Sequence, residues 1–305
     1  MIEENFKNNL PYDDDSIDIR ELLRSVLDRK LSFVSITLSF AIFSVLYSLS
    51  LTNIYTSEAI LMPAEDTRGS RSSGGYGEIA SMVGLSSTSS SVSKTDKGIK
   101  ELESFIFFKN IIESNDILPE LFASKTYDKK NKILEYDQEI YDAKKSSWIG
   151  HDKKPSDQQA FRVFKSIFEV EKDKEGFIVI SISHMSPYFA KDLLDIIIES
   201  INEQSRQKDK IDAEESIKYL TEELIKTNLY EIKQVLSRLI ENQIQSLVLT
   251  EVRKEYLFKV IEPPIVPEIK SIPNRALICI VITILGSILS FLICIYLHFR
   301  KKHSS

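Results

Sequence analysis

The side chains that most often perform catalysis or bind metals are sparse in this chain of 305 residues. The phosphate-binding pattern GxxxxGK[ST], the metalloprotease pattern HExxH and the nucleophile pattern GxSxG are absent. Carboxylates are numerous, but the polar faces of helices account for them. The histidines are scattered, and no closely spaced pair of cysteines accompanies them: His151, His184, His298 and His303. The sequence therefore predicts no catalytic residue, no cofactor site and no metal site, and a protein that is not an enzyme.

Both cysteines of the chain, Cys279 and Cys294, lie in one apolar segment near its C-terminal end. On one helix their separation corresponds to a rise of about 22 Å, which is far beyond the reach of a disulfide. We interpret both as small packing residues rather than as redox or metal-binding groups. The rest of the chain lacks cysteine, so its folded part must be held together by packing alone.

Two apolar segments dominate the hydropathy pattern. Residues 31–51 and 276–297 contain no Asp, Glu, Lys or Arg. A hydrocarbon core about 30 Å thick needs about 20 helical residues, so each segment is long enough to span a membrane once. The first is longer than the apolar core of a signal peptide and begins only at Leu31, so we expect an uncleaved anchor. The pattern excludes a freely soluble protein, a porin-like barrel and a many-helix transporter.

Basic residues lie on the outer side of both apolar segments: Arg20, Arg24, Arg29 and Lys30 before the first, and Arg300, Lys301 and Lys302 after the second. Such charges resist translocation, so residues 1–30 and 298–305 should be cytoplasmic tails. Residues 52–275 should then form one extracytoplasmic domain. That domain has 31 Lys and Arg against 37 Asp and Glu, and this net charge of −6 argues against nucleic-acid binding.

The first half of this domain alternates between short elements and polar loops. Residues 55–61 have the pattern of a strand, and residues 66–97 are so rich in Ser and Gly that we expect a loop. Its apolar part, residues 79–85, could dock on the domain. Residues 98–123 show helical spacing interrupted at Asn115-Asp116 and Pro119, and residues within 164–183 alternate as a β-hairpin.

The second half is predicted to contain one very long helix, over about residues 187–262. Ser186 and Pro187 provide the cap and first turn, and neither Gly nor Pro occurs again before Pro263. An apolar stripe follows steps of three and four and shifts by one residue at Ile225; before the shift it comprises Ala213, Ile217, Leu220 and Leu224. A continuous helix would reach about 110 Å. Its stripe would need other helices or other copies of the chain as partners, as in a coiled coil.

The candidate functional residues lie where the domain returns to the second apolar segment: Pro263, Pro264, Pro267, Pro273, Arg275 and Gly286. The prolines stop the helix and hold the chain extended, at least as a stiff spacer. Gly286 and Ser290 form a small-xxx-small pair, and Ser44 and Ser48 form another in the first segment. Such pairs allow close helix packing in lipid, although serines also occur in membrane helices without that role.

Five motifs, in order, resemble the chain length determinant (Wzz) family, the class 1 polysaccharide co-polymerases of bacterial inner membranes. They are SIDIRELLRSVLDRK, GEIASMVGL, KELESFIFFKNIIESNDILPELFA, SHMSPYFAKDLLDIIIESIN and YLFKVIEPPIVPEIKSIPNRAL. Two features depart from the family. Asn274-Arg275 follows Pro273 where the family often has lysine, and Gly286 is the only glycine in a segment that is usually glycine-rich.

The resemblance implies an α+β fold in which two transmembrane helices flank a periplasmic α/β domain with a very long extended helix. It also implies a non-enzymatic regulator of the modal chain length of a surface polysaccharide, usually the O antigen of lipopolysaccharide. Such proteins act as inner-membrane homo-oligomers with the O-antigen polymerase and its lipid-linked polysaccharide. Only the short tail 298–305 follows the second segment, which disfavours the kinase-linked co-polymerases.

Two other functions are alternatives to this one. A two-span scaffold or adaptor could serve the export of another polysaccharide, such as capsule or common antigen. A two-span sensor is disfavoured because the tails 1–30 and 298–305 are too short for an output domain.

Overall fold

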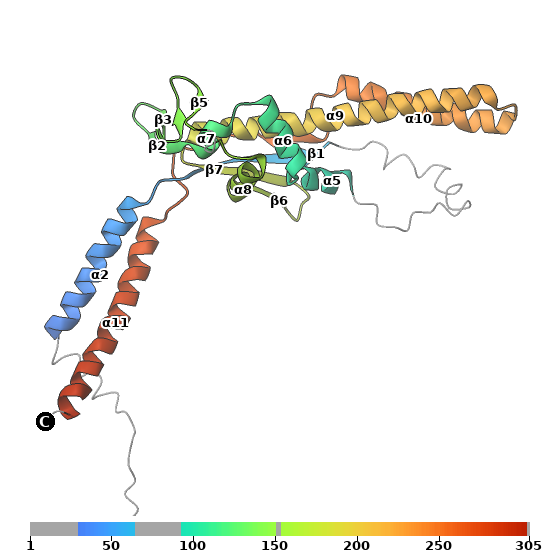
Figure 1. Ribbon diagram of the computed structural model, residues 1–305. Coiled ribbons are helices and arrows are strands. Elements are labelled where there is room, and N and C mark those ends of the chain that lie inside the picture. The colour runs from blue at the N-terminus through green and yellow to red at the C-terminus, as the bar shows by residue number, and fades with distance from the viewer. Residues whose placement is uncertain (1–29, 65–92, 151–153, 304–305) are drawn as a thin grey trace, which may run out of the picture. The chain divides into compact units, whose positions relative to one another are not determined.

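The computed structural model describes residues 30–64, 93–150 and 154–303 (Figure 1). The chain divides into two units, one of residues 52–272 and one formed by the two ends of the chain. The fold mixes helices and strands, with one long apolar helix toward each end. This is the α+β class that the sequence predicts.

The unit formed by the chain ends is a pair of contacting helices, α2 (Lys30–Ser50) and α11 (Arg275–His303). Both are long and apolar enough to cross a membrane, judged by length and composition. Many of their large apolar side chains are exposed, among them Leu31 and Ile280. Exposure of so many such side chains would be unfavourable in water and is favourable in lipid. A helix is therefore present at each of the two predicted apolar segments.

A four-stranded antiparallel sheet lies within the unit of residues 52–272, with the strand order β6-β7-β1-β8. The strands are β1 (Tyr55–Pro63), β6 (Phe168–Lys172), β7 (Ile178–His184) and β8 (Phe258–Glu262). Ala59 pairs with Ile180 and Leu61 with Ile178, and all four side chains are buried. Alternate residues of β1 are exposed or half-buried, as expected for an antiparallel sheet with one covered face. The predicted strand and the predicted β-hairpin are confirmed.

Helices cover the buried face of this sheet. The short ones are α5 (Lys94–Leu102), α6 (Phe105–Ser114), α7 (Leu118–Phe122) and α8 (Asp157–Ile167). α8 contacts β6 and β7, and the longer helix α9 (Pro187–Lys226) contacts β1 and β7. Phe107, Phe108 and Phe164 are buried in a single core with side chains of the sheet and of α9. The break predicted at Asn115-Asp116 falls between α6 and α7.

Two small hairpins precede α8. They are β2 (Ser124–Asp128) with β3 (Ile133–Tyr136), and β4 (Tyr141–Asp142) with β5 (Ser147–Trp148). The ring centroids of Tyr127 and Tyr55 are 6.3 Å apart in an edge-on arrangement, so the β2–β3 hairpin lies beside the first residue of β1.

The prediction of one helix over residues 187–262 is wrong. The structure contains α9, then α10 (Tyr230–Val252) running back beside it as an antiparallel helical hairpin, and then strand β8 (Figure 1). Thr227 and Leu229 adopt extended backbone conformations between the two helices, close to the shift of the apolar stripe at Ile225. Folding back lets each helix bury part of its stripe against the other, without a second chain. The predicted start is confirmed, because the Ser186 hydroxyl accepts a hydrogen bond from the Phe189 amide at 3.3 Å.

Two further segments differ from the sequence prediction or lie outside the described residues. The sequence analysis does not predict α8, which begins with a capping box formed by Ser156 and Gln159. Of the Ser- and Gly-rich segment 66–97, residues up to 92 lie outside the described residues, and the remainder includes the first turn of α5.

Candidate functional site: the return segment and the helical hairpin

The predicted functional residues do not form one cluster. They divide between the two units, with Pro263, Pro264 and Pro267 in the unit of residues 52–272 and Pro273, Arg275 and Gly286 in the helical pair. Pro264 and Pro273 are buried, Pro267 and Arg275 are half-buried, and Pro263 is exposed. The six residues therefore belong to two separate groups, one in each unit.

Residues 263–272, called the return segment here, are bound to the beginning of β1. The Ile54 amide donates to the Ile272 carbonyl at 2.8 Å, and the Ser271 amide donates to the Ile54 carbonyl at 2.9 Å. The Ser57 hydroxyl donates to the carbonyl of Ile265 at 2.8 Å. The segment is thus a fixed continuation of β8 along β1 rather than only a stiff spacer.

Gly286 lies where the two apolar helices are in close contact. A Cβ atom built on it would be 2.5 Å from Cβ and 2.6 Å from Cγ of Phe40, distances at which atoms overlap. One helical turn later, the Ser290 hydroxyl donates to the Phe33 carbonyl at 3.1 Å. Both small residues of this pair therefore serve the contact between the two helices of one chain, the kind of packing that small residues permit.

Asn202 of α9 binds the outer edge of strand β8. Its Oδ1 accepts hydrogen bonds from the amides of Leu257 and Phe258 at 2.8 and 2.9 Å, and its Nδ2 donates to the Phe258 carbonyl at 3.0 Å. Nδ2 also donates to the Ile198 carbonyl at 3.1 Å. The side chain is only 5% exposed. Its amide thus satisfies the backbone of an edge strand as a neighbouring strand would.

Asp209 of α9 forms a second connection, to α5 and to Tyr256, which precedes β8 in the chain. The carboxylate of Asp209 lies 2.7 Å from the Lys94 ammonium and accepts a hydrogen bond from the Tyr256 hydroxyl at 2.6 Å. The Lys94 Nζ also lies 4.2 Å from the centroid of the Tyr256 ring, within the range of a cation–π contact. These groups fix the position of α9 relative to α5.

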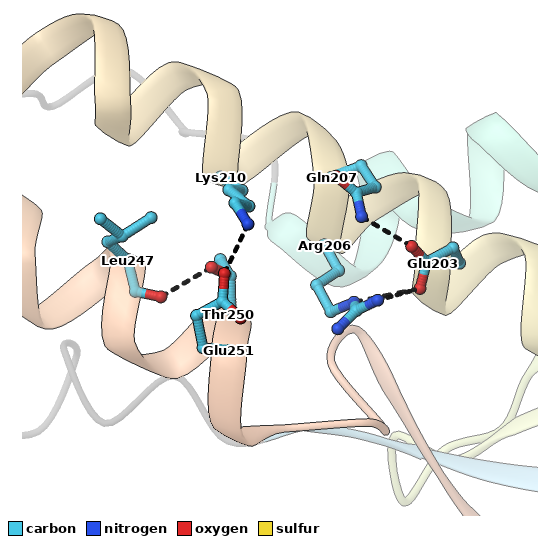
Figure 2. A network of polar contacts seen from close by, with 7 residues as sticks. All are labelled: Glu203, Arg206, Gln207, Lys210, Leu247, Thr250 and Glu251. Carbon is cyan, nitrogen blue, oxygen red and sulfur yellow. Dashed lines mark hydrogen bonds and ion pairs between the residues drawn. The ribbon is translucent and has the colours of Figure 1, made fainter.

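Polar side chains of α9 and α10 form further contacts in this part of the hairpin (Figure 2). Glu203 accepts from Arg206 at 3.0 Å through Nε and from Gln207 at 2.8 Å, and Lys210 of α9 pairs with Glu251 of α10 at 2.5 Å. The hydrogen bond from Gln207 is the main cause that lowers the pKa of Glu203, and the Lys210 bond lowers the pKa of Glu251. Water screens surface contacts of this kind, so they add little stability. The contacts of Glu203 lie within α9, whereas the Lys210–Glu251 pair connects α9 to α10.

His184, at the end of β7, is buried and neutral. Its Nδ1 accepts from the Ser186 amide at 3.1 Å, which places the ring proton on Nε2, and Nε2 donates to the Glu120 carbonyl at 3.2 Å. Burial lowers the pKa of His184 to about 4, against the opposing effect of these hydrogen bonds. This histidine holds α7 against the start of α9 and has the environment of a structural residue.

Asn202, His184 and Phe40 are important positions that the sequence analysis does not single out. A signal for Asn202 exists, since it continues the buried positions Leu194, Ile198 and Ile201 of α9, where an amide needs a partner. No sequence signal connects Phe40 to Gly286, because their pairing depends on how two distant helices meet.

The contacts at these residues are hydrogen bonds, ion pairs and packing contacts that join elements of the fold. The described residues include no group of three or more His, Cys, Asp or Glu side chains that could hold a metal ion. Cys279 is half-buried, and Cys294 is buried within the helical pair. The contacts described above hold α9 against β8 and α5 and hold the return segment along β1.

The fold and these contacts define a class of protein: an α+β domain with a long helical hairpin, preceded and followed in the chain by apolar helices that are each long enough to span a membrane. Within this class, residues 15–124 match the model of the family described as Wzz, chain length determinant protein. The matched residues contain the first three of the five sequence motifs, so the match agrees with the resemblance to the chain length determinant family over this part of the chain.

Two solved structures are similar to the chain at low identity. A full-length bacterial polysaccharide co-polymerase is 11% identical, with 94% of this chain and 100% of that chain covered and a TM-score of 0.42. A fragment of WzzB, a polysaccharide co-polymerase from Salmonella Typhimurium, is 13% identical, with 72% and 100% covered and a TM-score of 0.29. No curated protein matches the sequence. The similarity to the chain length determinant family is therefore the match over residues 15–124.

Proposed function

We propose that this protein regulates the chain length of a surface polysaccharide, namely the O antigen of lipopolysaccharide, as a scaffold that is not itself an enzyme. The observation that carries the proposal is the match of residues 15–124 to the chain length determinant family. The two apolar helices toward the chain ends support it, because they would hold the intervening domain at a membrane through both of its ends.

The proposed location is the bacterial inner membrane, with both tails cytoplasmic and the domain of residues 52–275 periplasmic. The basic residues outside each apolar segment support this orientation. Reporter fusions test it directly. A fusion at Ser305 should behave as cytoplasmic, and one inserted near Trp148 as periplasmic. A cytoplasmic signal at Trp148 would contradict both the orientation and the function built on it.

The proposed working form is a homo-oligomer that acts with the O-antigen polymerase on its lipid-linked polysaccharide. Helix α10 leaves several large apolar side chains exposed even though it packs on α9, among them Tyr230, Val235, Ile244, Val248 and Val252. A ring of copies is a closed arrangement that would cover such a surface. Detergent-extracted protein should therefore form a large homo-oligomer. A mass equal to that of one 35.0 kDa chain plus detergent, over a wide concentration range, would contradict this form.

The function is tested by deleting the gene in its own bacterium and comparing the ladder of glycan lengths. Loss of a regulator should broaden the distribution of O-antigen lengths while polymer continues to be made. An unchanged O-antigen ladder with a changed capsule or common-antigen profile would favour the scaffold for export of another polysaccharide. Loss of all polymer would instead argue for a catalytic role.

The return segment offers a finer test of the same function. Replacing Pro263, Pro267 or Pro273 with alanine relaxes the backbone where the domain meets the second apolar helix. We expect a shifted modal length with normal amounts of protein and oligomer. Glycan gels should be read beside immunoblots of the membrane fraction. Reduced protein with no other change would mean that these prolines serve only insertion and folding.

A further inference from the structure

The end of the domain from which the chain leads to the apolar helices carries exposed isoleucines. Ile265 and Ile269 of the return segment are 64% and 82% exposed, and Ile133 of β3 is 57% exposed. Single exposed apolar residues are ordinary on protein surfaces. What sets these apart is their place in the chain and the charges beside them.

The contacts within the unit bring the β2–β3 hairpin to the return segment. The Lys129 ammonium donates to the Glu268 carbonyl at 3.1 Å, and Tyr127 packs edge-on to Tyr55. We call the exposed residues Lys129, Lys130, Ile133, Ile265 and Ile269 the basal patch.

The chain itself limits how far the basal patch can lie from the membrane. Ile269 is six residues before Arg275, where helix α11 begins, and six extended residues reach at most about 20 Å. On the other side, Ile54 follows the end of α2 at Ser50 by four residues and is bound to Ile272. If α2 and α11 span the bilayer as proposed above, the return segment is held close to the lipid headgroups by both.

The turn that carries the two lysines of the patch differs in charge from the domain as a whole. The turn of residues 128–132 (DKKNK) contains three lysines and one aspartate, whereas residues 52–275 have a net charge of −6. Asp128 is committed to the turn, since its Oδ1 accepts from the Lys130 amide at 2.8 Å and its pKa is lowered mainly by that bond. None of the three lysines forms an ion pair with a carboxylate among the residues that the structure describes.

We propose that the basal patch binds the surface of the periplasmic leaflet, with its isoleucines at the boundary of the acyl chains and its lysines on the phosphates of anionic phospholipids. Apolar side chains flanked by lysines are the chemistry of interfacial membrane binding. The proposal rests on the two-span topology of the proposed function. The patch would hold the domain at a fixed height and tilt, independently of any partner protein.

The test uses the full-length protein in lipid nanodiscs, with Cys279 and Cys294 replaced by alanine. A spin label is placed at Ile269→Cys, and its collisions with oxygen and with a water-soluble nickel complex are compared. The matched control is Ile225→Cys at the far end of α9, where the native side chain is 76% exposed. Each variant is measured in phosphatidylcholine alone and in a mixture with phosphatidylglycerol.

We expect the label at position 269 to be shielded from the nickel complex and accessible to oxygen. Phosphatidylglycerol should increase both the shielding and the oxygen accessibility. The label at position 225 should stay accessible to the nickel complex in both lipids. The double variant Lys129→Glu and Lys130→Glu should lose the effect of phosphatidylglycerol, and the exposed control Lys218→Glu should keep it. A label at 269 that is as accessible to the nickel complex as the one at 225, in both lipids, would overturn the proposal and leave the patch open to a protein partner.

This experiment separates the lipid contact from the proposed function. The nanodiscs contain neither polymerase nor glycan, so failure of the chain-length function would not alter the label at position 269. Conversely, a water-exposed label at 269 in a protein that still shifts the glycan ladder would refute only the lipid contact.

Discussion

The side chain of Asn202 should be one of the largest single contributors to the stability of the domain. Replacing it with alanine removes the partners of three backbone groups, the amides of Leu257 and Phe258 and the carbonyl of Phe258. At about 1 kcal/mol for each buried hydrogen bond, the free energy of unfolding should fall by about 3 kcal/mol. This is a large part of the roughly 5–15 kcal/mol that stabilises a typical domain.

The measurement is denaturant unfolding of the full chain in detergent, followed by the fluorescence of Trp148. The control is Gln207→Ala, which removes an exposed amide with one hydrogen bond from the same helix and should cost less than about 0.5 kcal/mol. A loss below about 1 kcal/mol for Asn202→Ala would refute the reasoning, because it would mean that water or a shifted strand replaces the amide at little cost.

The isosteric variant Asn202→Asp separates the two halves of the amide. It keeps an acceptor for the two amides but places a carboxylate oxygen against the carbonyls of Ile198 and Phe258 in place of a donor. Its pKa should therefore be raised in the folded state, so the variant should regain stability as the pH falls and the protonated side chain donates again.

Three further predictions address other parts of the molecule. Gly286→Leu should destabilise the helical pair by about 1–3 kcal/mol, because the new side chain would overlap Phe40. Adding Phe40→Ala should restore the thermal stability. If it does not, the two residues are not in contact. His184 stays neutral in the folded protein, whereas in the unfolded chain it is protonated below its usual pKa of 6.5. The free energy of unfolding should therefore fall by up to about 3 kcal/mol as the pH drops from 6.5 to 4. In melts over the same pH range, the His184→Gln variant should not show this loss of stability. Lys210→Met should leave the unfolding free energy nearly unchanged, because water screens its surface pair with Glu251. A clear loss of stability in denaturant melts would show that this pair is needed to hold α9 and α10 together.

The sequence was most informative where local chemistry alone decides the structure. Ser186 and Pro187 predict the first residue of α9, and the alternation around Val170 and Ile180 predicts the β6–β7 hairpin, because caps and turns are set by neighbouring residues. The two apolar helices follow from length and composition in the same way.

The sequence was misleading where distant contacts outweigh local preference. The turn between α9 and α10 contains neither glycine nor proline, so helix propensity predicts a continuous helix across Thr227. In the structure the packing of one helix on the other favours a reversal of the chain at this point. Phe258 and Val260 belong to a strand because β1 offers a partner and Asn202 binds the opposite edge. The residues that flank Phe258 and Val260 in the sequence do not indicate that β1 and Asn202 will be their neighbours. In the same way, no sequence signal indicates that Phe40 lies opposite Gly286.

The position of the two chain connections on the sheet has a mechanical consequence. β1 and β8 are antiparallel neighbours, so the chain enters and leaves at the same end, where Ile54 and Ile272 are joined. Because the hydrogen bonds of an antiparallel pair run perpendicular to the strands, a force that draws the two apolar helices apart within a membrane would pull directly along those bonds. It would load the bond between Ile54 and Ile272 first and then each bond in turn, as in peeling, rather than all of them together, as in shear. Lateral tension would therefore open this sheet progressively from the end nearest the helices, at much lower force than tension directed along the strands.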